Sequence, residues 1–262
     1  MSTQPYYLLV TNGHQPLPFL LTGSKEEMIC EYTGFDNPPI EDLTTDAYNL
    51  DGAIYQGFKV PPRAITLTLY FLNKRFFATN KDILLGTFGS GETVTLSYGS
   101  STTAEKTIDA VVQTVNFPRF ESPRKAHVVM QINLTAYDPY WQNVTGTSAT
   151  KAFNQTFSFG LTPGTYPTPF TVTIATGTAI VNPTIHLGND YLKLTGSFTE
   201  RLVIDTAKKT ITANNQNIIS AWTHGSKWLK LKPSATNNIT LTADNSSTRA
   251  TKVAFKERYG HV

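Results

Sequence analysis

The chain has 262 residues, of which 40% are hydrophobic and 16% are charged. Its 22 basic and 19 acidic residues leave a formal charge of +3, which is too weak to predict nucleic acid or an anionic membrane as a partner. The length predicts about two domains. A charged fraction below the average of roughly 25% is typical of sheets and subunit contacts.

Cys30 is the only cysteine, so an intrachain disulfide is excluded. The first ten residues carry no positive charge ahead of their short apolar patch, and no apolar run approaches the ~20 residues that span a bilayer. We therefore expect no secretory signal, no membrane segment, and synthesis in a cytoplasm.

The first half is predicted to consist of strands and one helix. Ile65, Leu67, Leu69 and Phe71 share one face of an alternating strand headed by Arg63. The helix candidate is Asn73–Phe88, with Ile83, Leu84 and Phe88 expected to face inward. Further strands are expected at 6–10, 28–32, 53–60, 92–98 and 107–117, and the strand at 53–60 can pair across the turn Asp51-Gly52.

The strand 127–137 ends this half. Its apolar side chains alternate with polar ones, and it stops at Asp138-Pro139 because proline has no amide hydrogen to donate. The polar run that follows is rich in Thr, Ser, Gly and Asn, which is typical of a linker. We therefore expect a domain at 1–141, a linker at 142–152 and a second domain at 153–262.

The second half is predicted to be short strands separated by turns every 8 to 12 residues. The candidates are 153–159, 170–175, 183–187, 191–195, 201–205, 208–213, 227–232, 238–243 and 249–258. Strands without a covering helix must hide their apolar sides against each other. The prediction is a mainly β protein: an N-terminal β-sandwich or barrel-like domain with one helix, followed by an antiparallel β-sandwich.

The motifs of catalysis are missing from the sequence. The histidines (14, 127, 186, 224 and 261) lack metal-ligand spacing, and no nucleophile elbow, Walker loop or dinucleotide fingerprint occurs. An acidic stretch is interpreted as a solvated loop, with metal binding, an interface and catalysis left as alternatives; it contains Asp36, Glu41, Asp42, Asp46 and Asp51. No catalytic residue, metal or cofactor is predicted.

Two groups of side chains are candidates for contacts. Trp222 and Trp228 can fill a core or subunit contact, or stack on sugar rings. Arg119, Arg124 and Lys125 lie in a proline-bounded loop and are candidates for an interface.

The order of several motifs resembles that of the distal tail (Dit) proteins of siphophages. The first half contains Gly34-x3-Pro38-Pro39, then Asp51-Gly52, then Arg63 heading an alternating strand, then a helix, then Asp138-Pro139-Tyr140-Trp141. The second half contains Leu-Val-Ile-Asp-Thr at 202–206 and Trp-Leu-Lys-Leu-Lys-Pro at 228–233. One departure is Asn214-Asn215, where the family often has Asn-Gly, and it leaves that turn's geometry open.

The resemblance implies a non-enzymatic structural hub at the distal end of the phage tail, made in the host bacterial cytoplasm. Its N-terminal domain would form a hexameric ring, which can stack on a second ring, and its C-terminal domain would be a galectin-like β-sandwich. The ring would join the tail tube protein to the tail-associated lysin or fibre and to a receptor-binding protein. The alternative is a carbohydrate-binding or adhesin protein.

Overall fold

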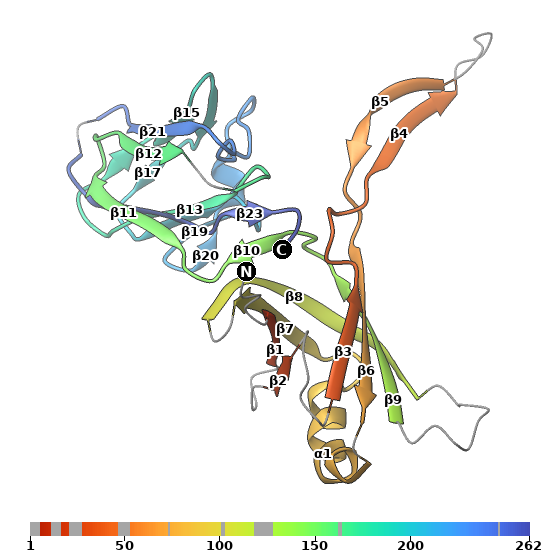
Figure 1. The fold of residues 1–262 in the computed structure, drawn as a ribbon. Helices are drawn as coiled ribbons and strands as arrows, with labels where there is room; N and C mark the ends of the chain where they lie inside the picture. The colour runs from red at the N-terminus through yellow and green to blue at the C-terminus, as the bar shows by residue number, and fades with distance from the viewer. Residues whose placement is uncertain are drawn as a thin grey trace. The chain divides into compact units, whose positions relative to one another are not determined.

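The computed structural model describes residues 6–11, 17–20, 28–46, 53–72, 74–100, 103–117, 128–161, 164–245 and 247–262. The chain divides into two compact units (Figure 1). Unit 1 comprises Met1–Val144 with Gly260–Val262, and unit 2 comprises Thr145–Tyr259. The described part is mainly β with one α-helix, as the sequence predicts.

Unit 1 is built on a long antiparallel sheet. Its described strands follow the order β2-β1-β7-β8-β9-β6-β3, and the short strand β10 pairs with β8. The bounds are β1 Tyr6–Thr11, β2 Leu17–Leu20, β3 Met28–Thr33, β6 Arg63–Phe71, β7 Thr93–Ser100, β8 Thr103–Asn116, β9 Val128–Ala136 and β10 Trp141–Asn143. Every second side chain of β6 is buried, which is the alternation that the sequence predicts for this strand.

The helix α1, Lys74–Thr87, follows β6. Leu84 and Phe88 are one helical turn apart and both are buried. Ile83 is 45% exposed, so its predicted inward orientation is wrong: it lies one position off the buried stripe, about 100° around the helix. No helix in the described ranges has the length and apolar character that crossing a bilayer requires.

Strands β4, Glu41–Asp46, and β5, Ala53–Lys59, form a separate hairpin. Figure 1 shows it continuing the direction of β3 and β6 beyond the end of the sheet. The interpretation of the acidic stretch as a loop is therefore wrong over 41–46. This strand carries a single large apolar side chain, Leu43, so its sequence lacks the alternation that identifies a half-buried strand.

Unit 2 is a sandwich of two antiparallel sheets. One has the order β11-β22-β13-β18-β19-β20 and the other β12-β21-β15-β16. Its elements are β11 Thr147–Ala152, β12 Phe157–Leu161, β13 Phe170–Ile174, β14 Ile180–Val181, β15 Thr184–Leu187, β16 Asp190–Lys193, β17 Ser197–Phe198, β18 Leu202–Asp205, β19 Thr210–Ala213, β20 Gln216–Asn217, η1 Ile219–Ala221, β21 Thr236–Thr242, β22 Ala250–Phe255 and β23 Arg258–Tyr259. Both sheets contribute to one buried core, including Phe157, Ile239, Val172 and Ile204.

Two stretches of the chain differ from their expected conformations. The segment 142–152, expected as a linker, includes most of β10 and all of β11, which pairs with β22 at the edge of its sheet. Polar residues with a lysine are typical of an edge strand, and this explains why the composition resembles that of a linker. The candidate strand 227–232 is wrong: within it only Leu231 makes a bridge, to Thr168.

Candidate functional site

The hairpin β4–β5, called the arm below, displays apolar side chains to solvent. Thr44 lies opposite Tyr55 and Asp42 lies opposite Phe58, because a register shift between Leu43 and Thr44 changes the phase of β5. Tyr55 and Phe58 therefore share a face, and they are 60% and 56% exposed. Ile40, just before β4, is 60% exposed as well. In the described part of the chain, β4 and β5 pair only with each other.

Charges on the arm contribute little to its stability. Glu41 and Lys59 lie opposite each other and form an ion pair of 3.1 Å, but both side chains are 55% exposed. Such pairs are worth about 0–1 kcal/mol. The described residues contain no group of three His, Cys, Asp or Glu side chains placed to hold a metal. In the acidic stretch, Asp36 lies in the loop before β4 and Glu41 and Asp42 lie in β4.

A buried arginine forms hydrogen bonds at the base of the arm. Arg63, the first residue of β6, is 1% exposed. Its Nη1 donates to the carbonyl oxygens of Gly34 at 3.2 Å and Asp36 at 2.8 Å, and its Nη2 donates to Gly260 O at 2.7 Å. Because Gly34 and Asp36 lie between β3 and β4, these bonds fix where the chain enters the arm. Charge-assisted bonds of this kind are among the stronger hydrogen bonds of a protein.

Gly34 fits this arrangement for steric reasons. Its φ is +84°, and a Cβ at this position would lie 2.1 Å from the carbonyl oxygen of Ala64. The backbones of the loop and of β6 therefore approach as closely as they do because residue 34 has no side chain.

Aromatic rings pack around the same loop. Phe35 lies 5.0 Å from the fully buried Trp141, 4.2 Å from Tyr32 and 6.2 Å from Tyr98, measured between ring centroids. Pairs at such distances add about 0.5–1.5 kcal/mol beyond the area they bury. We call Gly34, Phe35, Asp36, Arg63 and Trp141 the arm root.

Several residues quoted for the family resemblance meet at or near the arm root. Pro38 and Pro139 are buried, Pro39 is exposed, and Tyr140 is half-buried beside Trp141. Asp138 accepts a hydrogen bond of 3.2 Å from Gln142. Asp51 and Gly52 lie outside the described residues, as do the interface candidates Arg119, Arg124 and Lys125.

Unit 2 has a buried arginine that the sequence analysis did not identify. The Arg249 side chain donates to the carbonyl oxygens of Phe198 at 2.8 Å, Glu200 at 2.5 Å and Thr178 at 3.4 Å, and also to that of Ala175. Burial lowers the pKa of this guanidinium, while the charge of Glu200 raises it. Its acceptors are backbone carbonyls 49 to 74 residues away, so no local pattern marks it.

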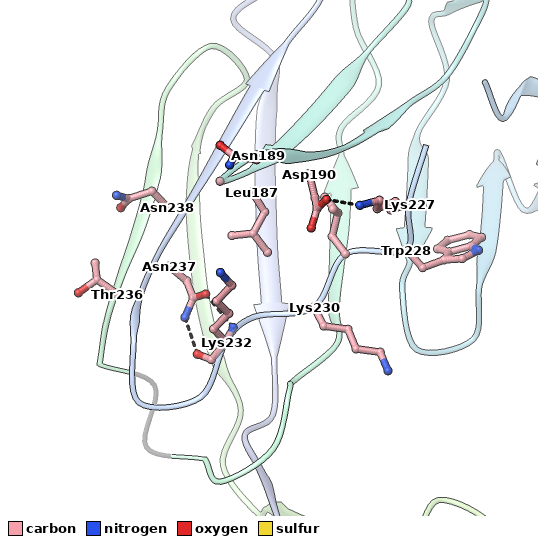
Figure 2. A pocket seen from close by; sticks show the side chains of 12 residues that line it. Leu187, Asn189, Asp190, Lys227, Trp228, Lys230, Lys232, Thr236, Asn237 and Asn238 are labelled. Atoms are coloured by element: carbon pink, nitrogen blue, oxygen red, sulfur yellow. Dashed lines mark hydrogen bonds and ion pairs between the residues drawn. The ribbon is translucent and has the colours of Figure 1, made fainter. Parts of the chain in front are cut away.

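The two candidate tryptophans stack on each other. The ring centroids of Trp222 and Trp228 are 4.5 Å apart, and both side chains are partly buried against the sandwich core. Figure 2 shows the indole of Trp228 to the side of the groove described next, beyond Lys227.

A groove of about 560 Å³ lies at the turn between β15 and β16. We call it the lysine groove; it is lined by Leu187–Asp190, Lys227–Lys230, Lys232 and Thr236–Asn238. Figure 2 shows Leu187 in the middle of the groove. Asp190 and Lys227 lie on one side of it and form an ion pair of 2.6 Å, and the side chains of Lys232 and Asn237 lie on the other side.

Comparison with known proteins finds one family model and several solved structures that are similar to the chain. Residues 163–259 match the family described as "Siphovirus-type tail component, C-terminal domain". No curated protein sequence matches the chain. The crystal structure of SPP1 Dit (gp 19.1), called "a Paradigm of Hub Adsorption Apparatus in Gram-positive Infecting Phages", is 16% identical and has a TM-score of 0.68, covering 97% of this chain and 98% of that chain. A chain of the phage P2 baseplate in its activated conformation with Ca is 8% identical, with a TM-score of 0.49 and coverage of 98% and 99%.

The resemblance stated from the motifs is confirmed, because the family match and the fold agree on the same kind of protein. Residues 163–259 are similar to the siphovirus-type tail component family, and the fold of the chain is similar to that of SPP1 Dit over nearly its whole length.

Proposed function

We propose that this tail component is the structural hub of a phage tail tip, and that copies of it assemble into a ring through the arm. The observation that carries the proposal is the arm itself. A two-stranded hairpin is marginally stable alone in water, and this one exposes Ile40, Tyr55 and Phe58. Apolar side chains gathered on an exposed element mark an interaction surface.

A second copy of the chain is the occupant that we propose for the apolar face of the arm. A ring made by rotation needs two different, complementary faces on each subunit. The arm would be one face, and the flank of the main sheet would be the other. That flank ends at β3, which pairs with β6 and, among the described strands, is an edge of the sheet; its Ile29 is 43% exposed.

The family resemblance supplies the number of copies and the neighbours. It implies six subunits, a tail tube protein on one side of the ring, and a tail-associated lysin or fibre on the other. SPP1 Dit, which shares the fold, is described as a hub of an adsorption apparatus. We propose the same position, the distal end of the tail in the virion, and a role without catalysis.

The experiment is native mass spectrometry of the purified full-length chain over a range of concentrations, with electron microscopy of any ring. We expect six-fold rings, and we expect Tyr55→Ser with Phe58→Ser to weaken assembly at least about tenfold while the protein stays folded, since each buried aromatic contributes on the order of 1.5–3 kcal/mol.

The matched control is Tyr137→Ser, which removes an exposed tyrosine elsewhere in unit 1. It should leave the rings intact. A chain that stays monomeric at every concentration would contradict the ring, and equal loss of assembly in the control would contradict the arm as the contact.

A further inference from the structure

The charge of the chain is unevenly distributed between the units. Residues 145–259 contain 12 Lys and Arg but only 5 Asp and Glu, a formal charge of +7, while the remaining residues contain 10 basic and 14 acidic residues, a charge of −4. The overall value of +3 conceals this difference. A compact unit with a large net charge of one sign raises the local concentration of ligands of the opposite sign.

The lysine groove concentrates this positive charge in a concave site. Lys227, Lys230 and Lys232 line it together with a single acidic residue, Asp190, which is paired with Lys227. The lining thus has a net charge of +2. A concave surface with protein walls focuses the field of its charges more than a flat surface does.

The wall that carries Lys232 is held in place by Asn237. Its side chain accepts a hydrogen bond of 2.9 Å from Lys232 N and donates to Lys232 O at 2.9 Å and to Ala235 O at 3.0 Å. Asn237 is 3% exposed, so these hydrogen bonds are buried and shielded from competition by water. The loop that shapes the groove is therefore preorganised, which lowers the entropy cost of binding.

The remaining lining residues combine apolar and amide surface. Leu187 and Leu229 contribute apolar atoms, and Asn189 and Asn238 are exposed amides. The volume lies within the range of roughly 300–1,000 Å³ that holds small ligands. A saccharide matches this mixture, because its ring has apolar C–H faces and its hydroxyls pair with amides.

We propose that the lysine groove binds an anionic saccharide, a sugar unit that carries a phosphate or carboxylate group. The anionic group would lie against the lysine side chains, the hydroxyls against Asn189 and Asn238, and the ring against Leu187. The site is complete within one copy of unit 2, so this inference does not depend on the proposed ring.

The test measures binding of the full-length chain to ligands displayed on one polymer backbone, by biolayer interferometry at fixed ionic strength. The probes are glucose 6-phosphate, glucuronate, glucose, a simple alkyl phosphate and polyglutamate. We expect the glucose 6-phosphate or the glucuronate polymer to bind at least about tenfold more tightly than the glucose and alkyl phosphate polymers, because charge and ring are both used.

Lys230→Gln with Lys232→Gln should weaken that binding by about tenfold or more. The matched control is Lys252→Gln with Lys256→Gln, which removes the same charge from unit 2 outside the groove lining. It should have less than about a threefold effect, because neither lysine lines the groove and salt screens exposed charges that do not contact the ligand. Circular dichroism of each variant establishes that it is folded.

Four outcomes would overturn the proposal. The first is that neither anionic sugar polymer binds, and the second is that the glucose or alkyl phosphate polymer binds as tightly as they do. The third is that polyglutamate binds more tightly than either, which would indicate an acidic protein partner. The fourth is that the control variant loses as much affinity as Lys230→Gln with Lys232→Gln.

Discussion

The two units expose apolar surface to very different extents. Of the twelve large hydrophobic side chains that are exposed in the described part of the chain, ten lie in unit 1, and only Tyr191 and Ile219 lie in unit 2. Unit 2 buries its apolar side chains between its own two sheets. Unit 1 has a buried core along its sheet but extends an arm whose two strands, among the described strands, pair only with each other. The difference agrees with the proposal that unit 1, and not unit 2, uses exposed apolar surface for assembly.

Both units nevertheless contain a buried arginine that connects loops through hydrogen bonds to backbone carbonyls. Arg63 and Arg249 are each buried and each donate to several backbone carbonyls. The guanidinium group suits this role because it has five donors in a fixed plane and keeps its charge when buried. In unit 2 the bonds tie loops of the sandwich together, while in unit 1 they fix the base of the arm.

Removal of the arginine in unit 2 should have the largest effect. Arg249→Met leaves four carbonyls without their donor, and we expect it to lower the free energy of unfolding of unit 2 by about 4 kcal/mol. Urea-dependent hydrogen exchange, resolved to peptides of each unit, separates the effects. Only peptides from 145–259 should lose protection.

Arg201→Met is the control, since Arg201 is exposed and the change in charge is the same. Protection lost equally in both units would contradict the view that unit 2 is independently stable. Arg63→Met should show the converse pattern, with the loss restricted to unit 1.

A smaller but more local effect is expected at the arm root. Gly34→Ala introduces a Cβ that would lie 2.1 Å from Ala64 O, at a φ of +84°. Since the obstacle is backbone, we expect a loss of about 3 kcal/mol in unit 1 and weaker ring assembly. Thermal unfolding and native mass spectrometry measure the two effects.

Gly91→Ala distinguishes steric clash from backbone strain. Gly91 has a φ of +89°, but nothing lies within 4 Å of its added Cβ, so only about 1 kcal/mol should be lost. Equal losses at the two positions would mean that the close approach at Gly34 is unimportant.

These residues also separate what the sequence predicts from what it does not. The alternation at 65–71 predicts a strand with one buried face, and the structure confirms it. The arm is harder to predict from the sequence because residues 41–46 have no apolar periodicity. The role of Arg249 is harder still to predict, because its acceptors are backbone carbonyls, which every residue has, and they are distant in sequence. Periodicity identifies elements that pack against a core. A hairpin that pairs only with itself, or a side chain bound to backbone carbonyls, has no such pattern.

Cys30 provides a pH-dependent test of the core of unit 1. Burial, followed by the charge of Glu31, raises the pKa of its thiol from 9.0 to about 12. The folded state therefore retains the proton when the unfolded state has lost it, and stability falls as pH rises above 9. We expect the free energy of unfolding of wild type minus that of Cys30→Ala to be constant below pH 9 and to fall by about 1.4 kcal/mol per pH unit above it. A flat difference between pH 8 and 11 would contradict the burial of this thiol.

The smallest effect is expected at the turn between β19 and β20, where the sequence departs from the family's usual Asn-Gly. Ala213 pairs with Gln216, so the turn consists of Asn214 and Asn215, with φ of 46° and 64°. Positive φ at both positions is the requirement of a type I′ turn, which the structure satisfies with two asparagines.

Asn tolerates this region, but glycine adopts it without steric cost. Asn215→Gly should therefore stabilise unit 2 by about 0.5 kcal/mol, and Asn215→Ala should destabilise it by about 1 kcal/mol, as measured by urea unfolding. Neither variant should change ring assembly, because the turn belongs to unit 2, which buries its apolar core within itself. A change in assembly with either variant would place this turn in a subunit contact and weaken the distinction between the two units.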